Sequence, residues 1–158
     1  MPVFLYSNTK STILTPDGET EHFDILAGIL QGDTLAPFLF IIVIDYIMCV
    51  SVDTMGENGL LYQPRRSYRY PALHITDADF ADNIALLSDN LANAEALLSA
   101  LESAANSTGL YLNETTTECM PINIRNHIDM KTLANNILKC VDDYKYLGSH
   151  VTNSEKRL

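Results

Sequence analysis

Residues 73–87 read LHITDADFADNIALL, in which a polar centre separates two apolar runs. Asp and Asn accept the backbone angles of a tight turn that β-branched residues resist, so Asp82 and Asn83 predict a hairpin between residues 73–75 and 84–87. The Asp82 carboxylate is then expected at the hairpin tip, where a bound ion or phosphate can reach it. An Asp-Asn pair in a turn is more often a solvated connector, so its role depends on the rest of the chain.

The length and charge of the chain limit what it can bind. Its 158 residues and 47% apolar content suit one packed core, so we expect a single domain over residues 1–158. The net charge is −10, whereas a protein that binds nucleic acid by itself usually has a basic surface. The charge therefore predicts weak nucleic-acid binding. Arg65, Arg66 and Arg69 form a positive cluster, interpreted as a solvated loop in preference to a phosphate contact.

The cysteines and apolar runs indicate an intracellular protein of the cytoplasm or nucleus. Cys49, Cys119 and Cys140 are far apart in the sequence, which suits reduced thiols better than a disulfide framework or a zinc knuckle. The first residues lack the basic start and long apolar centre of a secretory signal, so secretion is not expected. Residues 35–44 are apolar but fall short of the ~20 residues of a membrane span, and they predict a buried helix without membrane association.

The pattern of turns and apolar spacing predicts a mixed α and β fold. The tripeptide at residues 16–18, Pro-Asp-Gly, predicts a turn between strands at 11–14 and 19–25, with Phe23, Ile25 and Ala27 on the inner face. Residues 53–69 predict a loop with at most one short strand at 60–62. Further strands are expected at residues 110–113, 118–122 and 144–147.

Two helices are expected between these strands. Thr34 is expected to cap the first, which runs to about Val50 with Pro37 in its first turn. This helix is apolar almost all round, so it must be covered on most sides. The second begins after caps at residues 89–90, has apolar residues at helical spacing from Leu91, and ends at Gly109.

Four segments, taken in chain order, carry a resemblance to a known family. They are GILQGDTLAPFLF at residues 28–40, FADN at 80–83, GLYLN at 109–113 and YKYLGS at 144–149. In this order they resemble the palm of reverse transcriptases, the RNA-directed DNA polymerases, of non-LTR (LINE-type) retrotransposons. The resemblance runs from about residue 6 to 151. It implies an α+β partial polymerase palm, with antiparallel hairpins packed on two main helices and with the fingers and first catalytic strand missing.

The resemblance also implies a metal-dependent reaction. Polymerase chemistry uses two divalent ions about 3.5–4 Å apart, bridged by carboxylates and by the incoming phosphates. The implied cofactor is Mg²⁺, with Asp82 as metal ligand and with Asp82 and Asn83 as the catalytic positions. In the family this hairpin carries two Asp residues, and Asn83 stands at the second. A further family Asp on an earlier strand has no counterpart, because Asp24 is interpreted as a solvent-facing strand residue.

The other segments imply contacts with an RNA template and a DNA primer. Gln31 and Gly32 would lie against the templating base and the incoming sugar. Thr116 or its neighbour Thr117 stands where the family usually has a triphosphate-binding Lys, and a hydroxyl cannot neutralise phosphate charge. The implied primer-binding residues are Tyr146, Leu147 and Gly148.

The three departures from the family pattern predict a reverse transcriptase-like fragment that is catalytically defective alone. They are the missing upstream Asp strand, Asn83 and the missing Lys. The alternatives are an active RNA-directed DNA polymerase domain and a non-catalytic nucleic-acid-binding or structural remnant. A calcium loop beginning at Asp77 is disfavoured, because it would need glycine at Asp82 and glutamate at Ser88. The missing strand leaves a hairpin edge unpaired, which predicts possible self-association.

Overall fold

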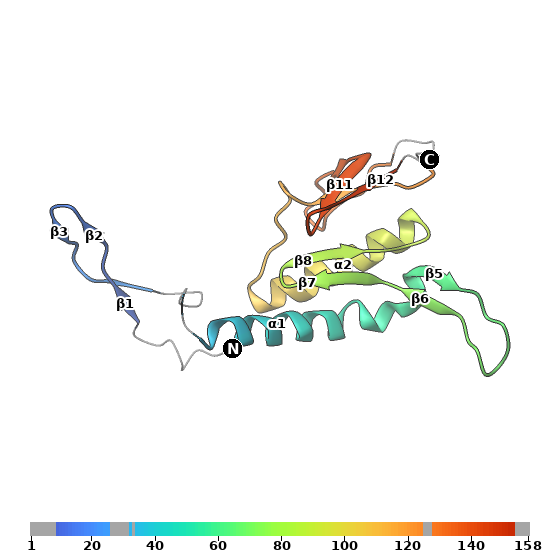
Figure 1. Ribbon diagram of the computed structural model, residues 1–158, viewed down its shortest axis with the longest axis horizontal. Helices are drawn as coiled ribbons and strands as arrows, with labels where there is room; N and C mark the ends of the chain where they lie inside the picture. The colour runs from blue at the N-terminus through green and yellow to red at the C-terminus, as the bar shows by residue number, and fades with distance from the viewer. Residues whose placement is uncertain (1–8, 26–31, 33, 125–127, 154–158) are drawn as a thin grey trace. The chain divides into compact units, whose positions relative to one another are not determined.

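The fold combines two main helices with several small antiparallel hairpins (Figure 1). This computed structural model describes residues 9–25, 32, 34–124 and 128–153. The α+β class and the two main helices are confirmed, while the assignment to a polymerase palm stays a prediction. The chain divides into two compact units, Met1–Val43 and Ile44–Leu158. In the part of the chain that is described, no helix is long and apolar enough to cross a membrane.

A long hairpin in the first unit confirms the predicted turn at residues 16–18. Its four strands are β1 (Lys10–Ser11), β2 (Leu14–Thr15), β3 (Gly18–Glu19) and β4 (Phe23–Asp24), with β1 paired to β4 and β2 to β3. Gly18 has a φ of +129°, and the Thr15 hydroxyl donates to the Gly18 carbonyl at 2.7 Å. Asp24 is a solvent-facing strand residue, as expected, with its carboxylate 4.0 Å from Lys10 Nζ. Phe23 is 46% exposed, so the expected inner face is only partly formed, and Ala27 lies outside the described residues.

Helix α1 (Ala36–Val50) begins two residues after the predicted cap Thr34 and has Pro37 in its first turn. Ile47 is buried, as is the following methionine. Phe38, Ile42 and Tyr46, spaced one turn apart, are 54–66% exposed. The expectation that this apolar helix is covered on most sides is therefore wrong for the described chain. The predicted self-association stays a prediction.

A short 3₁₀ helix and a hairpin follow α1. The 3₁₀ helix η1 (Asp53–Asn58) occupies a segment for which the sequence predicted only a loop. Strand β5 (Leu60–Gln63) confirms the predicted short strand and pairs antiparallel with β6 (Leu73–Ile75). The two strands approach closely at Gly59, where a Cβ atom would lie 2.7 Å from the Ile75 carbonyl oxygen.

The next hairpin pairs β7 (Asp77–Phe80) with β8 (Asn83–Leu86), which corrects one strand assignment. The predicted partner of residues 84–87 was the apolar run 73–75, but this run is β6 and pairs with β5. Residues 73–75 cannot pair with β8 across this turn because the connection between them is too long. Strands that pair on either side of a two-residue turn must adjoin it, so residues 77–80 take the place of the more apolar run.

Helix α2 (Leu91–Thr108) confirms the second predicted helix and both of its ends. The Asn90 side chain accepts a hydrogen bond from Asn93 N at 2.9 Å, and Gly109 ends the helix with a φ of 86°. The carboxylate of Glu102, which is 7% exposed, accepts a hydrogen bond from Leu133 N at 2.9 Å. This bond gives a buried polar side chain a partner and attaches the 131–137 segment to the helix. The core beside α2 consists of Leu98, Ile128, Met130 and Leu138.

The C-terminal part contains short strands and turns. Residues 110–113 do not form the predicted strand. They lead into a turn in which Asn113 accepts hydrogen bonds from residues 115–117. Strand β9 (Glu118–Cys119) is shorter than predicted and pairs in parallel with β10 (Lys139–Cys140). Strands β11 (Asp143–Tyr146) and β12 (Ser149–Thr152) form an antiparallel hairpin. Local side-chain hydrogen bonds at Asn113 thus replace the ladder that the apolar pattern suggested.

Candidate nucleic-acid interface at two hairpin tips

The β7–β8 hairpin places Asp82 at its tip, as predicted. Phe80 pairs with Asn83, so Ala81 and Asp82 form a two-residue turn and Asn83 is the first residue of β8. Ala81 has a φ of 57°, whereas the φ of Asp82 is not positive. Positive φ at the first turn residue alone is the pattern of a type II′ turn, which favours glycine at that position. An alanine there strains the turn by about 1–2 kcal/mol.

The side chains at this tip do not match a two-metal site. The Asn83 amide donates to Asp82 Oδ1 at 3.3 Å, and both side chains are exposed. Asn83 adds no negative charge, so Asp82 is the one carboxylate of the turn. Among the residues that the structure describes, no three His, Cys, Asp or Glu side chains are grouped so that they could hold a metal ion. The donor set here therefore does not fit the pair of Mg²⁺ ions that the resemblance implies.

The β11–β12 hairpin carries the predicted primer-binding residues in another tight turn. Tyr146 pairs with Ser149, so Leu147 and Gly148 form the turn. Their φ values are 47° and 86°, and positive φ at both residues is the pattern of a type I′ turn. Gly148 suits this backbone, but Leu147 is strained in it, and its side chain is 54% exposed. The large apolar side chain of Leu147 is thus exposed at the tip of the hairpin.

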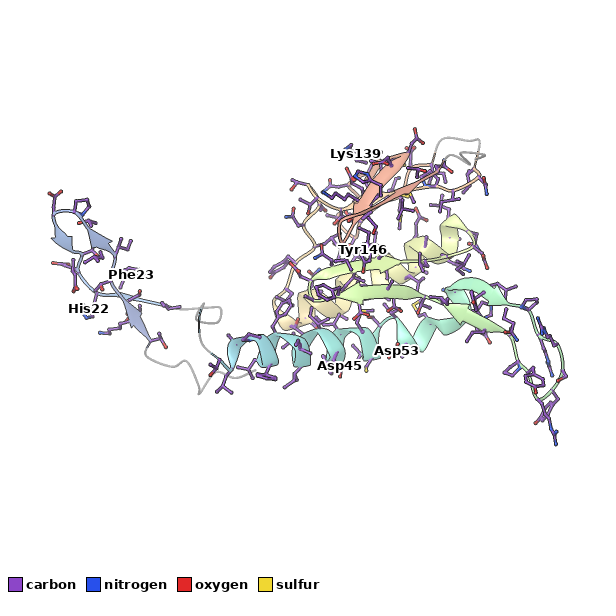
Figure 2. The ribbon with its side chains drawn as sticks, in the orientation of Figure 1. His22, Phe23, Asp45, Asp53, Lys139 and Tyr146 are labelled. Carbon is purple, nitrogen blue, oxygen red and sulfur yellow. The ribbon has the colours of Figure 1, made fainter. Side chains whose placement is uncertain are left out.

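The side chain of Tyr146 joins the two hairpins. Its hydroxyl donates to the Ala78 carbonyl at 2.9 Å and lies 3.4 Å from the carbonyl oxygen of Asn83, which is 63 positions away in the sequence. Figure 2 shows Tyr146 on the β11–β12 hairpin with its side chain directed toward β7 and β8. The structure therefore brings together the predicted catalytic segment and the predicted primer segment.

Of the remaining predicted site residues, Thr116 makes no hydrogen bond to either hairpin within the described part of the chain. The Thr116 hydroxyl donates to the Asn113 carbonyl at 3.3 Å, so it takes part in the turn after α2. Gly32 is exposed with a φ of +92° and belongs to the first unit. Gln31 lies outside the described residues. The expected contacts of these three residues with template and nucleotide stay predictions.

Two features of this interface were not predicted from the sequence. The first is the interhairpin bond of Tyr146, which joins residues too distant in sequence for any local pattern to indicate it. The second is the strained backbone at Ala81 and Leu147. A signal for this strain exists, because two-residue turns between paired strands require positive φ, and neither position has the expected glycine or asparagine.

The comparisons with known proteins link the chain to a retrotransposon protein. No protein-family model matches it. It is similar to the Retrovirus-related Pol polyprotein from type-1 retrotransposable element R2 of Popillia japonica, with 34% identity over 86 residues. This alignment covers 54% of the chain and 11% of that polyprotein, so the chain spans a small part of the relative's length. The similarity indicates a retrotransposon-related origin and does not specify a domain.

Proposed function

We propose that the chain is a reverse transcriptase-like palm segment of retrotransposon origin that contacts primer and template without extending the primer by itself. The observation that carries this proposal is the Tyr146 hydroxyl, 2.9 Å from the Ala78 carbonyl oxygen. This bond links the segment with the family's catalytic pattern to the segment with its primer-binding pattern. The similarity to the R2 Pol polyprotein supports the same ancestry.

The two tips would have unequal effects on a nucleic-acid strand. Leu147 and the glycine after it present an uncharged, exposed surface on which a sugar or base can rest. Asp82 presents an exposed carboxylate, which repels a phosphate unless a cation lies between them. Binding at this interface is therefore weak, and its apolar part is the β11–β12 tip.

The proposed lack of catalysis follows from the donor set at the β7–β8 tip. One carboxylate cannot bridge two divalent ions, and the amide of Asn83 supplies no charge. Restoring the second carboxylate with Asn83→Asp still leaves the upstream Asp strand missing. In this proposal Gln31, Gly32 and Thr116 keep the template- and nucleotide-facing positions that the resemblance gives them.

A binding experiment tests the primer contact. A fluorescent DNA primer annealed to an RNA template is titrated with the purified chain, and anisotropy is recorded for the parent and for Leu147→Glu. A negative charge at the contact should weaken binding about tenfold, the size of a 1.4 kcal/mol loss. The matched control is Ile122→Glu, because both parent side chains are 54% exposed. Equal effects of the two substitutions would contradict a primer contact at Leu147.

A primer-extension assay tests the catalytic part of the proposal. We expect no extension of the same primer with Mg²⁺ or Mn²⁺, either by the parent or by Asn83→Asp. Asp82→Ala serves as the control for contaminating polymerase. Extension by the parent that disappears in Asp82→Ala would refute the proposed defect, because it would reveal a carboxylate that completes the metal site.

A further inference from the structure

The loop between β5 and β6, residues 64–72, concentrates positive charge and aromatic side chains in an acidic chain. It reads PRRSYRYPA and holds three of the five arginines of the protein. No Asp or Glu occurs from residue 58 to 76, so this segment carries +3 while the whole chain carries −10. The rest of the chain therefore carries −13. Such a separation of charge makes the loop the part of the chain most attractive to an anion.

The tip of the loop has a defined turn. Tyr70 N donates to the Ser67 carbonyl at 3.2 Å, and Arg66 N donates to the Tyr70 carbonyl at 3.1 Å. These bonds place Tyr68 and Arg69 at the two central positions of the turn. In Figure 1 the loop extends beyond the ends of β5 and β6.

The side chains of the loop are free to contact a ligand. Every residue of the loop is exposed, and Tyr68 and Tyr70 are exposed to 92% and 63%. Tyr62, on the adjoining strand β5, is 67% exposed. Within the described ranges of the chain, the guanidinium groups of the loop make no hydrogen bond or ion pair. They would therefore bind a phosphate without first breaking an existing contact.

We propose that the 64–72 loop binds single-stranded nucleic acid. The arginines would pair with successive backbone phosphates through charge-assisted hydrogen bonds, and Tyr68 and Tyr70 would stack on bases. Base stacking needs unpaired bases, so a single strand is the ligand and a duplex is not. Stacking also tolerates any sequence, so no base preference is expected. RNA and DNA share this chemistry, and the experiment includes both.

This inference is independent of the proposed function, since none of the residues at the two hairpin tips belongs to the loop. An acidic protein partner could also meet arginines and tyrosines, which are frequent in protein interfaces. The order of residues 68–70, Tyr-Arg-Tyr, favours nucleic acid, because a ring that can stack on a base stands on each side of a group that can pair with a phosphate. The exposed rings of Tyr68 and Tyr70 also supply the flat surfaces that bases require.

The experiment measures anisotropy of fluorescent single-stranded RNA and DNA of about 12 nucleotides, with the full chain, between about 50 and 200 mM salt. Three phosphate contacts on a single strand predict a slope of about −2 in a plot of log K against log salt. The double variant Arg65→Gln with Arg66→Gln should reduce this slope to about −0.7 and weaken binding at low salt at least tenfold. The matched control, Lys10→Gln with Lys131→Gln, makes the same change in net charge outside the loop.

The aromatic contribution has its own pair of variants. Tyr68→Ala should weaken binding about tenfold and leave the salt slope unchanged. Tyr68→Phe keeps the aromatic ring and should therefore bind as tightly as the parent. The control is Tyr111→Ala, because Tyr111 is 79% exposed but lies outside the loop. Circular dichroism checks that each variant keeps the parent fold.

Four outcomes would overturn the proposal. They are no measurable binding of either strand by the parent, equal losses from the arginine and lysine pairs, equal losses from Tyr68→Ala and Tyr111→Ala, and tighter binding of duplex than of single strand. The Leu147→Glu variant separates this site from the proposed primer contact. Leu147→Glu reports on the primer contact, whereas the arginine pair and Tyr68 report on the loop, so either site can fail while the other stands.

Discussion

Replacing Ala81 by glycine tests the backbone conformation that holds Asp82 at the hairpin tip. Ala81 has a φ of 57°, and an L-residue in the left-handed region costs about 1–2 kcal/mol. Glycine removes this cost, but it loses about 0.5–1 kcal/mol more chain entropy on folding than alanine does. The difference predicts that Ala81→Gly raises the free energy of unfolding by about 0.5–1 kcal/mol.

Urea-induced unfolding, followed by circular dichroism, measures this change. The control is Ala85→Gly, because Ala85 lies on β8 of the same hairpin, opposite Ala78 and without positive φ. There glycine brings only its entropy cost, so the free energy of unfolding should fall by about 0.5–1 kcal/mol. The two substitutions are identical in chemistry and opposite in predicted sign. If both destabilise the protein alike, Ala81 is not strained and the turn assigned at Asp82 is wrong.

Three other substitutions test contacts elsewhere. Tyr146→Phe removes the 2.9 Å bond to the Ala78 carbonyl and should cost about 1 kcal/mol in urea unfolding; no change would mean that water replaces the bond without loss. Gly59→Ala puts a Cβ 2.7 Å from the Ile75 carbonyl oxygen and should cost about 1–3 kcal/mol in the same assay; wild-type stability would show that β5 and β6 separate freely. Burial raises the pKa of the Cys119 thiol from 9.0 to about 11, so the folded state holds this proton more tightly than the unfolded state. The resulting stability is complete below pH 9.0 and is lost as the pH rises to about 11. After allowance for solvent screening it amounts to about 1 kcal/mol. Cys119→Ala should therefore show a shallower alkaline decline in thermal stability than the parent, and an equal decline would contradict this cause.

Elements with local causes were predictable from the sequence. The first hairpin depends on a turn tripeptide at residues 16–18, and α2 depends on Asn90 at one end and Gly109 at the other. Each of these residues acts on the backbone within a few positions, so a single sequence contains the whole cause. The tip position of Asp82 was predictable for the same reason.

Errors arose where distant segments decide the structure. The apolar run 73–75 has a strand pattern, but the pattern cannot tell whether β5 or β8 is its partner. The apolar content of α1 predicted burial, but burial depends on a covering layer that helix periodicity does not specify. Tyr146 reads as an ordinary edge-strand aromatic until the fold brings Ala78 against its hydroxyl. The candidate interface could therefore be predicted as two separate segments but not as one site.

Net charge is a poor guide to nucleic-acid binding when the charges are unevenly distributed. The total of −10 predicts weak binding only if a ligand meets the average surface. At physiological ionic strength, exposed charges more than about 8 Å apart are largely screened from each other. A short strand at the 64–72 loop would therefore be attracted by three arginines on a segment, residues 58–76, that contains no Asp or Glu. A long or double-stranded ligand must also contact the acidic remainder of the chain. The charge distribution thus favours the binding of short single strands at the loop. Binding of primer and template at the two hairpin tips is still expected to be weak.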